Sequence, residues 1–239
     1  MPTQYIAGYK FTALNDLDHL QNHFVDCCRK LSLKGTILLS AEGININLAG
    51  APVAIADFIN ALKLDSRFID LPFHISYTDT PPFKRLKVKL KKEIITLRQP
   101  MVKPVEQRAP SIKPTEFKKW LDEKRDITIL DTRNDYEIKV GTFSNAVSLG
   151  LNDFVDFSTA TDKIDRHKPI VMFCTGGIRC EKAALHLLNE GFSDVFQLDG
   201  GILGYFKTVG NAHYHGDCFV FDDRVALDSN LNITNNGAA

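Results

Sequence analysis

The chain has 239 residues, and its 29 basic and 29 acidic side chains give a formal net charge of zero at pH 7. This length is sufficient for two domains of ordinary size, each with its own core, and the composition is that of a globular protein rather than a disordered or fibrous chain. The balanced total charge says nothing about a nucleic-acid partner, so the distribution of charge along the chain has to be considered instead.

No apolar run is long enough to cross a bilayer, and residues 1–11 lack the pattern of a secretory signal. We therefore expect a cytoplasmic protein with no membrane partner. The five cysteines are odd in number and mostly scattered, without the paired spacing of zinc ligands. Such cysteines are typical of a reducing compartment, and no cofactor is evident from them.

The first part of the chain predicts alternating strands and helices. Asn15 or Asp16 can cap the first helix, and Pro52 begins the second. The strands are expected at residues 5–12, 36–40, 44–48 and 73–77. The order β-α-β-β-α-β predicts a ferredoxin-like (acylphosphatase-like) α+β domain over residues 1–98. Domains of this type often bind nucleic acid through the open face of the sheet, although the fold alone does not prove it.

A basic strand follows the Pro-Pro break at residues 81–82 and continues to about Leu97. It alternates apolar and charged residues, and it holds six basic side chains and no acidic one between Lys84 and Lys92. One interpretation is an edge strand whose lysines prevent unwanted pairing. The other, which we favour, is phosphate contact. The candidate RNA-binding residues are Lys84, Arg85, Lys87, Lys89, Lys91 and Lys92.

Four prolines make residues 99–114 an expected extended linker. Beyond it, Thr115 can cap a helix, and short apolar strands are expected at residues 127–130, 146–149, 170–173 and 195–198, with another helix beginning near Ile202. Strands that alternate with helices predict a second, α/β domain with a central parallel sheet over residues 115–226. Residues 227–239 are expected to form a polar, disordered tail.

A cysteine stands at the turn between the strand at residues 170–173 and the following helix. Helix amino-termini and Gly-rich turns present free amides at this position, which favours an anion such as a thiolate. Together with the helix dipole and a nearby arginine, these amides should lower the thiol pKa and make Cys174 a nucleophile. The alternative is a small buried hydrophobe. The loop residues after Cys174 are Thr175, Gly176, Gly177, Ile178 and Arg179.

Two further features of this loop can be judged from spacing. Four residues separate Cys174 from Arg179, whereas the loop of cysteine phosphatases has five, so the smaller ring suits sulfur better than phosphate. Cys180 falls in the first helical turn and is either a packing residue or a candidate resolving thiol.

Two clusters of polar residues complete the set of candidates. Asp131, Arg133 and Glu137 are interpreted as a structural ion-pair cluster that supports the end of the sheet, in preference to a catalytic set. The alternation of His213, His215 and Asp217 could ligate a metal, but it is more typical of polar residues at a surface, so we predict no metal site.

Several motifs resemble those of known families. The loop at residues 174–179 resembles the active-site loop of rhodanese domains, as do Asp131-Thr132-Arg133, the segment 141–146 and Leu198-Asp199-Gly200-Gly201-Ile202. Segments 34–39, 42–45, 174–182 and 218–225 together resemble the bacterial rhodanese-type tRNA uridine hydroxylases. This resemblance implies a rhodanese domain in the second half. It also implies oxygen-dependent conversion of uridine 34 to 5-hydroxyuridine, with O2 as co-substrate and an unidentified electron donor.

The resemblance leaves several chemical possibilities open. Cys174 could attack C6 of the uracil ring, or it could carry a persulfide. The partner implied is the anticodon arm of tRNA, whose wobble base must leave its stack to be modified. The alternative activity is a sulfurtransferase that carries a persulfide on Cys174, and a third interpretation is an RNA-binding module in which the thiol only senses redox state. The oligomeric state and the tRNA isoacceptors are not predicted.

Overall fold

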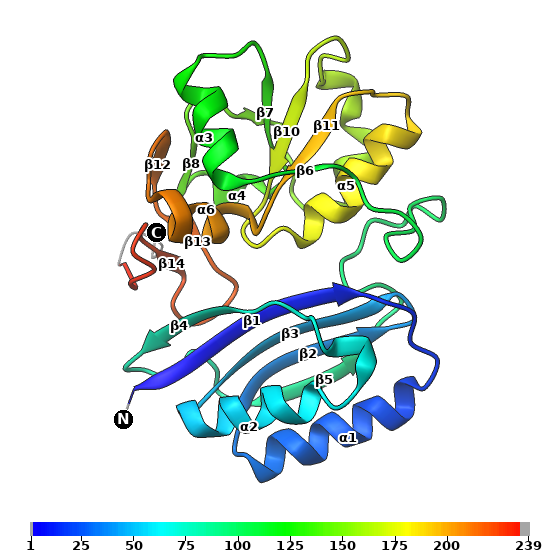
Figure 1. Ribbon diagram of the computed structural model, residues 1–239, viewed down its shortest axis with the longest axis vertical. Helices are drawn as coiled ribbons and strands as arrows, with labels where there is room; N and C mark the ends of the chain where they lie inside the picture. Colours follow the sequence, from blue (N-terminus) through cyan, green and yellow to red (C-terminus); the bar gives the residue numbers. More distant parts are fainter. Residues whose placement is uncertain (1, 235–239) are drawn as a thin grey trace. The chain divides into compact units, whose positions relative to one another are not determined.

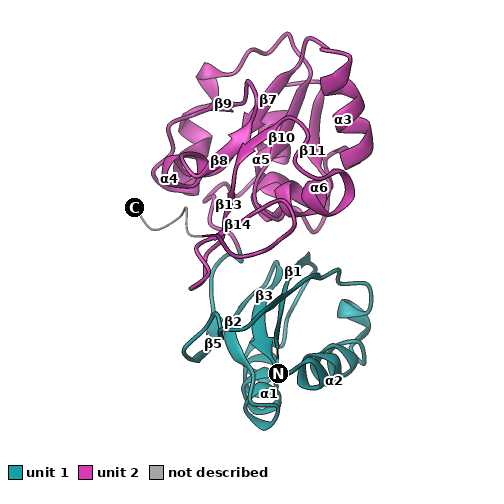
Figure 2. Cartoon of the chain, turned by 90° about the vertical axis from the view of Figure 1, so that its left-hand side faces the viewer, with its two compact units in different colours: residues 1–94 teal, residues 95–239 magenta. Residues whose placement is uncertain are grey.

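The chain divides into two compact units, which meet in sequence between Ile94 and Ile95 (Figure 2). The computed structural model describes residues 2–234. Within this range no helix has the length and apolar character needed to cross a membrane. All five cysteines are free thiols.

The first unit is a five-stranded sheet with two helices (Figure 1). Its strands, in the spatial order β4-β1-β3-β2-β5, pair antiparallel except for β5, which is parallel to β2. The elements in chain order are β1 (Thr3–Phe11), α1 (Leu17–Lys30), β2 (Lys34–Ser40), β3 (Gly43–Gly50), α2 (Pro52–Leu62), the 3-10 turn η1 (Ser66–Phe68), β4 (His74–Thr78) and β5 (Leu86–Leu90).

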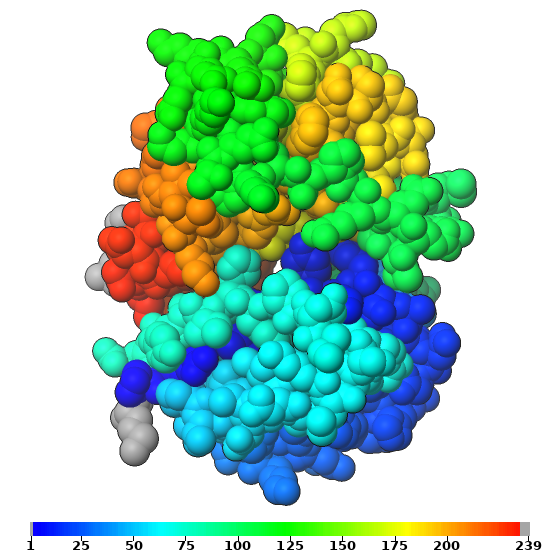
Figure 3. All heavy atoms as spheres, viewed as in Figure 1, coloured from blue at the N-terminus to red at the C-terminus, as the bar shows by residue number. Residues whose placement is uncertain are grey.

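Both helices of this unit cover the same face of the sheet (Figure 1). Alternate residues of the strands, such as Ile37 and Ile46, point into the core and pack with Phe24 of α1 and Phe58 of α2. In the space-filling view, the front of this unit is formed mostly by the cyan segment that contains α2 and η1, with blue residues of the amino-terminal part beside it (Figure 3). The predicted ferredoxin-like, acylphosphatase-like domain is confirmed by this arrangement.

The second unit is built around a parallel sheet with the strand order β6-β11-β10-β7-β9. Two small antiparallel pairs, β8 with β12 and β13 with β14, lie outside this sheet. The strands are β6 (Ser111–Ile112), β7 (Thr128–Asp131), β8 (Gly141–Phe143), β9 (Val147–Ser148), β10 (Ile170–Phe173), β11 (Val195–Leu198), β12 (Tyr214–Gly216), β13 (Cys218–Phe219) and β14 (Ala226–Leu227). The helices are α3 (Pro114–Asp122), α4 (Asp135–Ile138), α5 (Ile178–Asn189) and α6 (Gly201–Val209), with 3-10 turns η2 (Phe154–Thr159) and η3 (Thr161–Lys163).

The central strand β10 is buried on both faces, as expected for a parallel sheet with helices on each side. Ile170 and Met172 belong to the core that contains α5, whereas Val171 and Phe173 belong to the core formed with α3 and α6. The predicted α/β domain with a central parallel sheet is therefore confirmed. The carboxyl end of β10 leads directly into the cysteine loop.

Two boundaries differ from expectation. Residues 99–114, predicted as a linker, count with the second unit, and Val102 and Ala109 are buried in its core. Helix α3 begins at Pro114 with Lys113 in the capping position, so the predicted cap at Thr115 is wrong. Proline fits the first helical turn because its missing N–H has no partner there.

The expected tail is partly ordered. Leu227 pairs within β14 and forms a bridge to Ile233, so this part of the predicted disordered tail is structured. Residues 235–239 lie outside the described residues.

Candidate active site

The loop after β10 curls around the sulfur of Cys174. The backbone N–H of Gly177 donates a hydrogen bond to Cys174 Sγ over 3.1 Å. Gly177 stands at the head of α5 with φ of 99°, a left-handed conformation that glycine adopts without strain. The strand, turn and helix expected from the sequence are confirmed, and the sulfur lies at the amino-terminus of α5, where the helix dipole favours negative charge.

Cys174 is almost completely buried, with 1% of its surface exposed. Burial alone raises the pKa of its thiol, but a hydrogen bond from Cys180, the charge of Arg179 and the amides of Arg179 and Cys180 outweigh it, so the pKa falls to about 6. Cys174 is therefore largely a thiolate at neutral pH.

Cys180 has the opposite character. Burial, together with the hydrogen bond to Cys174 and the negative charge on that residue, raises the pKa of Cys180 well above its ordinary value. The hydroxyl of Thr132 lies 3.6 Å from Cys180 Sγ. The two cysteines thus share one proton, which Cys180 holds and directs towards the Cys174 thiolate.

Helix α6 holds the loop from its packed side. Ile202 N donates to the carbonyl of Cys174 over 2.9 Å, and Leu203 N donates to the carbonyl of Thr175 over 3.1 Å. Gly201 has φ of +60°, and a Cβ there would lie 2.4 Å from the Cys174 carbonyl oxygen. From the sequence, the Gly200-Gly201 pair is interpreted as a family motif and as the turn into a helix near Ile202, with no contact to the cysteine loop. Its physical role is to let the first turn of α6 reach the loop backbone.

Glu137 fixes the arginine of the loop. Arg179 donates from Nη1 and Nη2 to the two carboxylate oxygens of Glu137, over 2.6 and 2.8 Å. Glu137 is fully buried and Arg179 nearly so. A bidentate pair of this kind holds the planar guanidinium in one orientation. It raises the pKa of Arg179, although burial acts against this, so the charge beside Cys174 is permanent.

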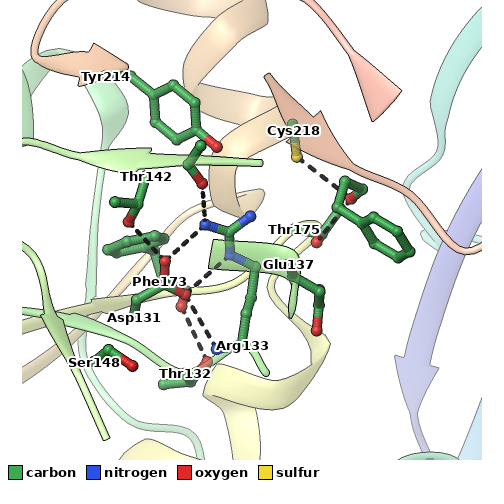
Figure 4. A network of polar contacts seen from close by, with 12 residues as sticks. Asp131, Thr132, Arg133, Glu137, Thr142, Ser148, Phe173, Thr175, Tyr214 and Cys218 are labelled. Carbon is green, nitrogen blue, oxygen red and sulfur yellow. Dashed lines mark hydrogen bonds and ion pairs between the residues drawn. The ribbon is translucent and has the colours of Figure 1, made fainter. Parts of the chain in front are cut away.

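The predicted three-residue ion-pair cluster is in fact two separate pairs. Asp131 accepts from Arg133 Nε over 2.9 Å and from Arg133 Nη2 over 2.7 Å, and Arg133 also donates to the Gly141 carbonyl over 2.6 Å (Figure 4). This pair links β7 to β8 and does not include the loop arginine. Glu137 belongs with Arg179 because α4 begins immediately after the Asp-Thr-Arg segment and turns its carboxylate towards α5.

A third thiol lies next to the loop. Cys218 in β13 is fully buried, and burial raises its pKa to about 12. The hydroxyl of Thr175 donates to the carbonyl of Phe219 over 3.5 Å, which joins the segment after Cys218 to the loop. Figure 4 shows Cys218 and Thr175 on neighbouring elements. Sequence reasoning used this segment only as part of a motif and gave it no role in the site.

One part of the loop reaches the surface. Thr175, Gly176 and Ile178 are half-buried, whereas the residues on either side are buried. A Cβ added at Gly176 would meet no atom within 4 Å. The loop is therefore packed on the side of α6 and open at its crest.

The basic stretch lies in the first unit at one edge of the sheet. Strand β5 ends at Leu90 rather than near Leu97, so the predicted strand is too long. Leu86 and Val88 pack on the core, and Gln21 of α1 donates to the Val88 carbonyl over 2.9 Å. Strand alternation places Lys87 and Lys89 on the face opposite the helices. The flanking residues Lys84, Arg85, Lys91 and Lys92 are exposed.

The neighbours of these lysines on the open sheet face are polar. The register places Lys87 beside Thr36 of β2, and Thr36 beside Asn47 of β3. Tyr5 donates its hydroxyl hydrogen to Asn47 Oδ1 over 2.8 Å, and Asn47 donates to Asn45 Oδ1 over 3.1 Å. This face thus combines lysines, amides and a tyrosine.

The two histidines of the carboxy-terminal motif have separate partners. His213 Nε2 lies 2.7 Å from Asp122 Oδ1, and His215 Nε2 lies 2.7 Å from Ser144 Oγ. Among residues 2–234 no three His, Cys, Asp or Glu side chains are grouped as metal ligands.

A parallel α/β unit with a cysteine loop at a strand-to-helix turn defines the class to which the second unit belongs, the rhodanese domains. Residues 113–208 match the rhodanese-like domain, and residues 3–94 match the UPF0176 acylphosphatase-like domain. A solved rhodanese-like domain from Anabaena sp is 25% identical over 45% of this chain and 79% of its own, with a TM-score of 0.39.

Full-length relatives define the family more closely. Proteins named tRNA uridine(34) hydroxylase from Cupriavidus pinatubonensis and Ralstonia nicotianae are 49% and 50% identical, over 95% of this chain and 83% of theirs. The Thiobacillus denitrificans protein of that name is 48% identical over 95% of this chain and 94% of its own. The chain belongs to the tRNA uridine(34) hydroxylase family.

Proposed function

We propose that this chain hydroxylates uridine 34 of tRNA at C5, giving 5-hydroxyuridine, with Cys174 as the nucleophile. Family membership supports the substrate. The observation that carries the role of Cys174 is its thiol pKa of about 6 at the head of α5. With that pKa, roughly nine-tenths of the thiol is ionised at pH 7.

The proposed chemistry begins with addition of the Cys174 thiolate to C6 of the uracil ring. This addition makes C5 carbanion-like, so that C5 can react with O2 and form a hydroperoxide. Loss of the C5 proton and of the thiolate from C6 then restores the aromatic ring. Arg179 stabilises the thiolate before the attack and after its release.

The second oxygen atom of O2 has to leave as water, which requires two electrons and two protons. We assign these to Cys174 and Cys180, whose oxidation to a disulfide supplies both. Cys180 reduces the hydroperoxide and becomes a sulfenic acid, and the released Cys174 thiolate then displaces the hydroxyl group. A single turnover without added thiol should therefore give one 5-hydroxyuridine and one Cys174–Cys180 disulfide per chain, measured by intact mass.

We assign the anticodon arm of the tRNA to the basic edge of the first unit. Lysines on the open sheet face and exposed basic residues around β5 match the phosphate backbone, which dominates RNA affinity. Reversing the charge at Lys87, Lys89 and Lys91 should lower the slope of binding affinity against salt by about 2 if all three contact phosphate. Arg29, Lys30 and Lys63, on the helix side, provide the matched control triple, which should bind as the wild type does.

The activity is tested by nucleoside mass spectrometry of tRNA incubated with the protein, with and without oxygen. The wild type should add one oxygen atom to uridine 34 only when oxygen is present. Cys174→Ser should produce none, and Cys28→Ser, which alters a buried cysteine of the first unit, should retain activity.

Two other products would contradict the proposal. A sulfur-containing nucleoside formed without oxygen would identify a sulfurtransferase. An additional sulfur atom on Cys174 during turnover would replace direct thiolate attack by a persulfide route. If the Cys174→Ser variant modified tRNA as the wild type does, Cys174 would not be the nucleophile and would only sense redox state.

A further inference from the structure

Three aromatic side chains form a connected group beside the active-site loop in the second unit. Tyr136 and Phe219 have ring centroids 5.3 Å apart, as do Phe219 and Phe221, and both pairs meet edge to face. Phe221 is 64% exposed and Tyr136 is 45% exposed. Large exposed rings cost solvation free energy, so two of them joined through Phe219 favour binding of an occupant.

Two of the rings contact residues that form the loop, and the third, Tyr136, precedes the glutamate that binds the loop arginine. The backbone of Phe219 accepts the hydrogen bond from Thr175. The guanidinium carbon of Arg179 lies 5.7 Å from the centroid of the Phe221 ring. Tyr136 directly precedes Glu137, the partner of Arg179, and Asn134 donates to its hydroxyl over 3.2 Å. Phe219 and Phe221 therefore contact residues of the loop, and Tyr136 joins them through Phe219.

The chemistry of the substrate limits what can occupy this group. A base that reacts with a buried thiolate has to leave its stack, at a cost of a few kcal/mol unless the enzyme offers another surface. Aromatic side chains offer such a surface, because every base has a π-face. Phe221 is the most exposed of the three rings at 64%, so it is the ring that a base can reach most readily.

We propose that Phe221 and Tyr136 form a stacking shelf for unpaired nucleotides of the substrate RNA at the entrance to the Cys174 loop. This inference rests on the proposed function and adds to it the residues that receive the unstacked bases. Stacking tolerates any base, so the shelf contributes affinity and position, and the choice of uridine lies with the loop itself.

The test compares substitutions at one exposed position. Phe221→Ala and Phe221→Leu should each lower kcat/KM for tRNA by about 10- to 100-fold, the range expected for loss of base stacking. Phe221→Tyr, which keeps a stacking ring, should retain wild-type kcat/KM. Leu64→Ala removes an even more exposed apolar side chain, 89% against 64% for Phe221, from the first unit and should have no effect.

A second readout does not depend on catalysis. In Phe221→Trp, single-stranded oligouridylate should quench the emission added by the new indole, whereas Leu64→Trp should show no quenching. Full activity of Phe221→Ala would overturn the shelf. Full activity of Phe221→Leu would also overturn it, because leucine keeps apolar contact but has no ring for stacking. Wild-type protein without hydroxylase activity, but with Phe221→Trp emission quenched by RNA, would overturn the proposed function and leave the shelf in place.

Discussion

The ionisation of Cys174 should link the stability of the second unit to pH. The pKa of this thiol is about 6 in the folded chain, against an ordinary value of 9.0. Between these values the unfolded state binds more protons, so folding stability rises with pH through the window. The contribution is fully present above pH 9 and is lost as the pH falls through 6.

The size of this contribution follows from the pKa difference. Three pKa units correspond to about 4 kcal/mol, of which about 2 kcal/mol should appear between pH 6 and pH 8. Burial raises the pKa of Cys28 and of Cys218 to about 12. These two thiols stay protonated in the folded state below pH 9, so they do not interfere in the window.

The assay is the ultraviolet absorbance of the thiolate, taken as the wild type minus Cys174→Ser across the pH range. It should titrate with a midpoint near 6, and Cys180→Ala should move the midpoint upwards because it removes the hydrogen bond to the thiolate. Urea denaturation at pH 6 and pH 8 should show the wild type gaining about 2 kcal/mol over Cys174→Ser. A midpoint near 9 would refute this account of the loop.

Three substitutions test how the loop is supported. Glu137→Gln leaves a buried guanidinium without its charge partner and should cost roughly 3–5 kcal/mol in urea denaturation, so a loss below about 1 kcal/mol would mean that the ion pair is not essential. Gly201→Ala forces a Cβ against the loop carbonyl at positive φ, which should cost about 1–3 kcal/mol and abolish activity. In Gly176→Ala the added methyl group enters open space. This variant should keep its free energy of unfolding within about 0.5 kcal/mol of the wild type while its kcat/KM falls. Unchanged turnover would show that the substrate does not pass the crest of the loop at Gly176.

Sequence reasoning located the reactive cysteine because strand β10, two glycines and an arginine are contiguous in the chain. It could not pair Glu137 with Arg179, since that contact depends on the turn of α4 across 42 residues of sequence. It also missed the role of Gly201, because the steric demand comes from carbonyls that only the folded chain brings near. Local patterns encode elements, whereas contacts between distant elements require the fold.

The packing around the cysteine loop determines from which side a polymer can approach the buried Cys174 sulfur. Helix α6 closes the loop from the side of Gly201, where no side-chain atom fits. The crest at Gly176 is open, and the polar backbone of Phe219 borders it through Thr175. A base that is stacked in a duplex cannot present its ring to a sulfur that is almost completely buried, so it has to leave its stack first. If Cys174 is the nucleophile, as proposed, burial also limits the water around the thiolate, which strengthens the electrostatic interactions of its charge with the loop amides and Arg179.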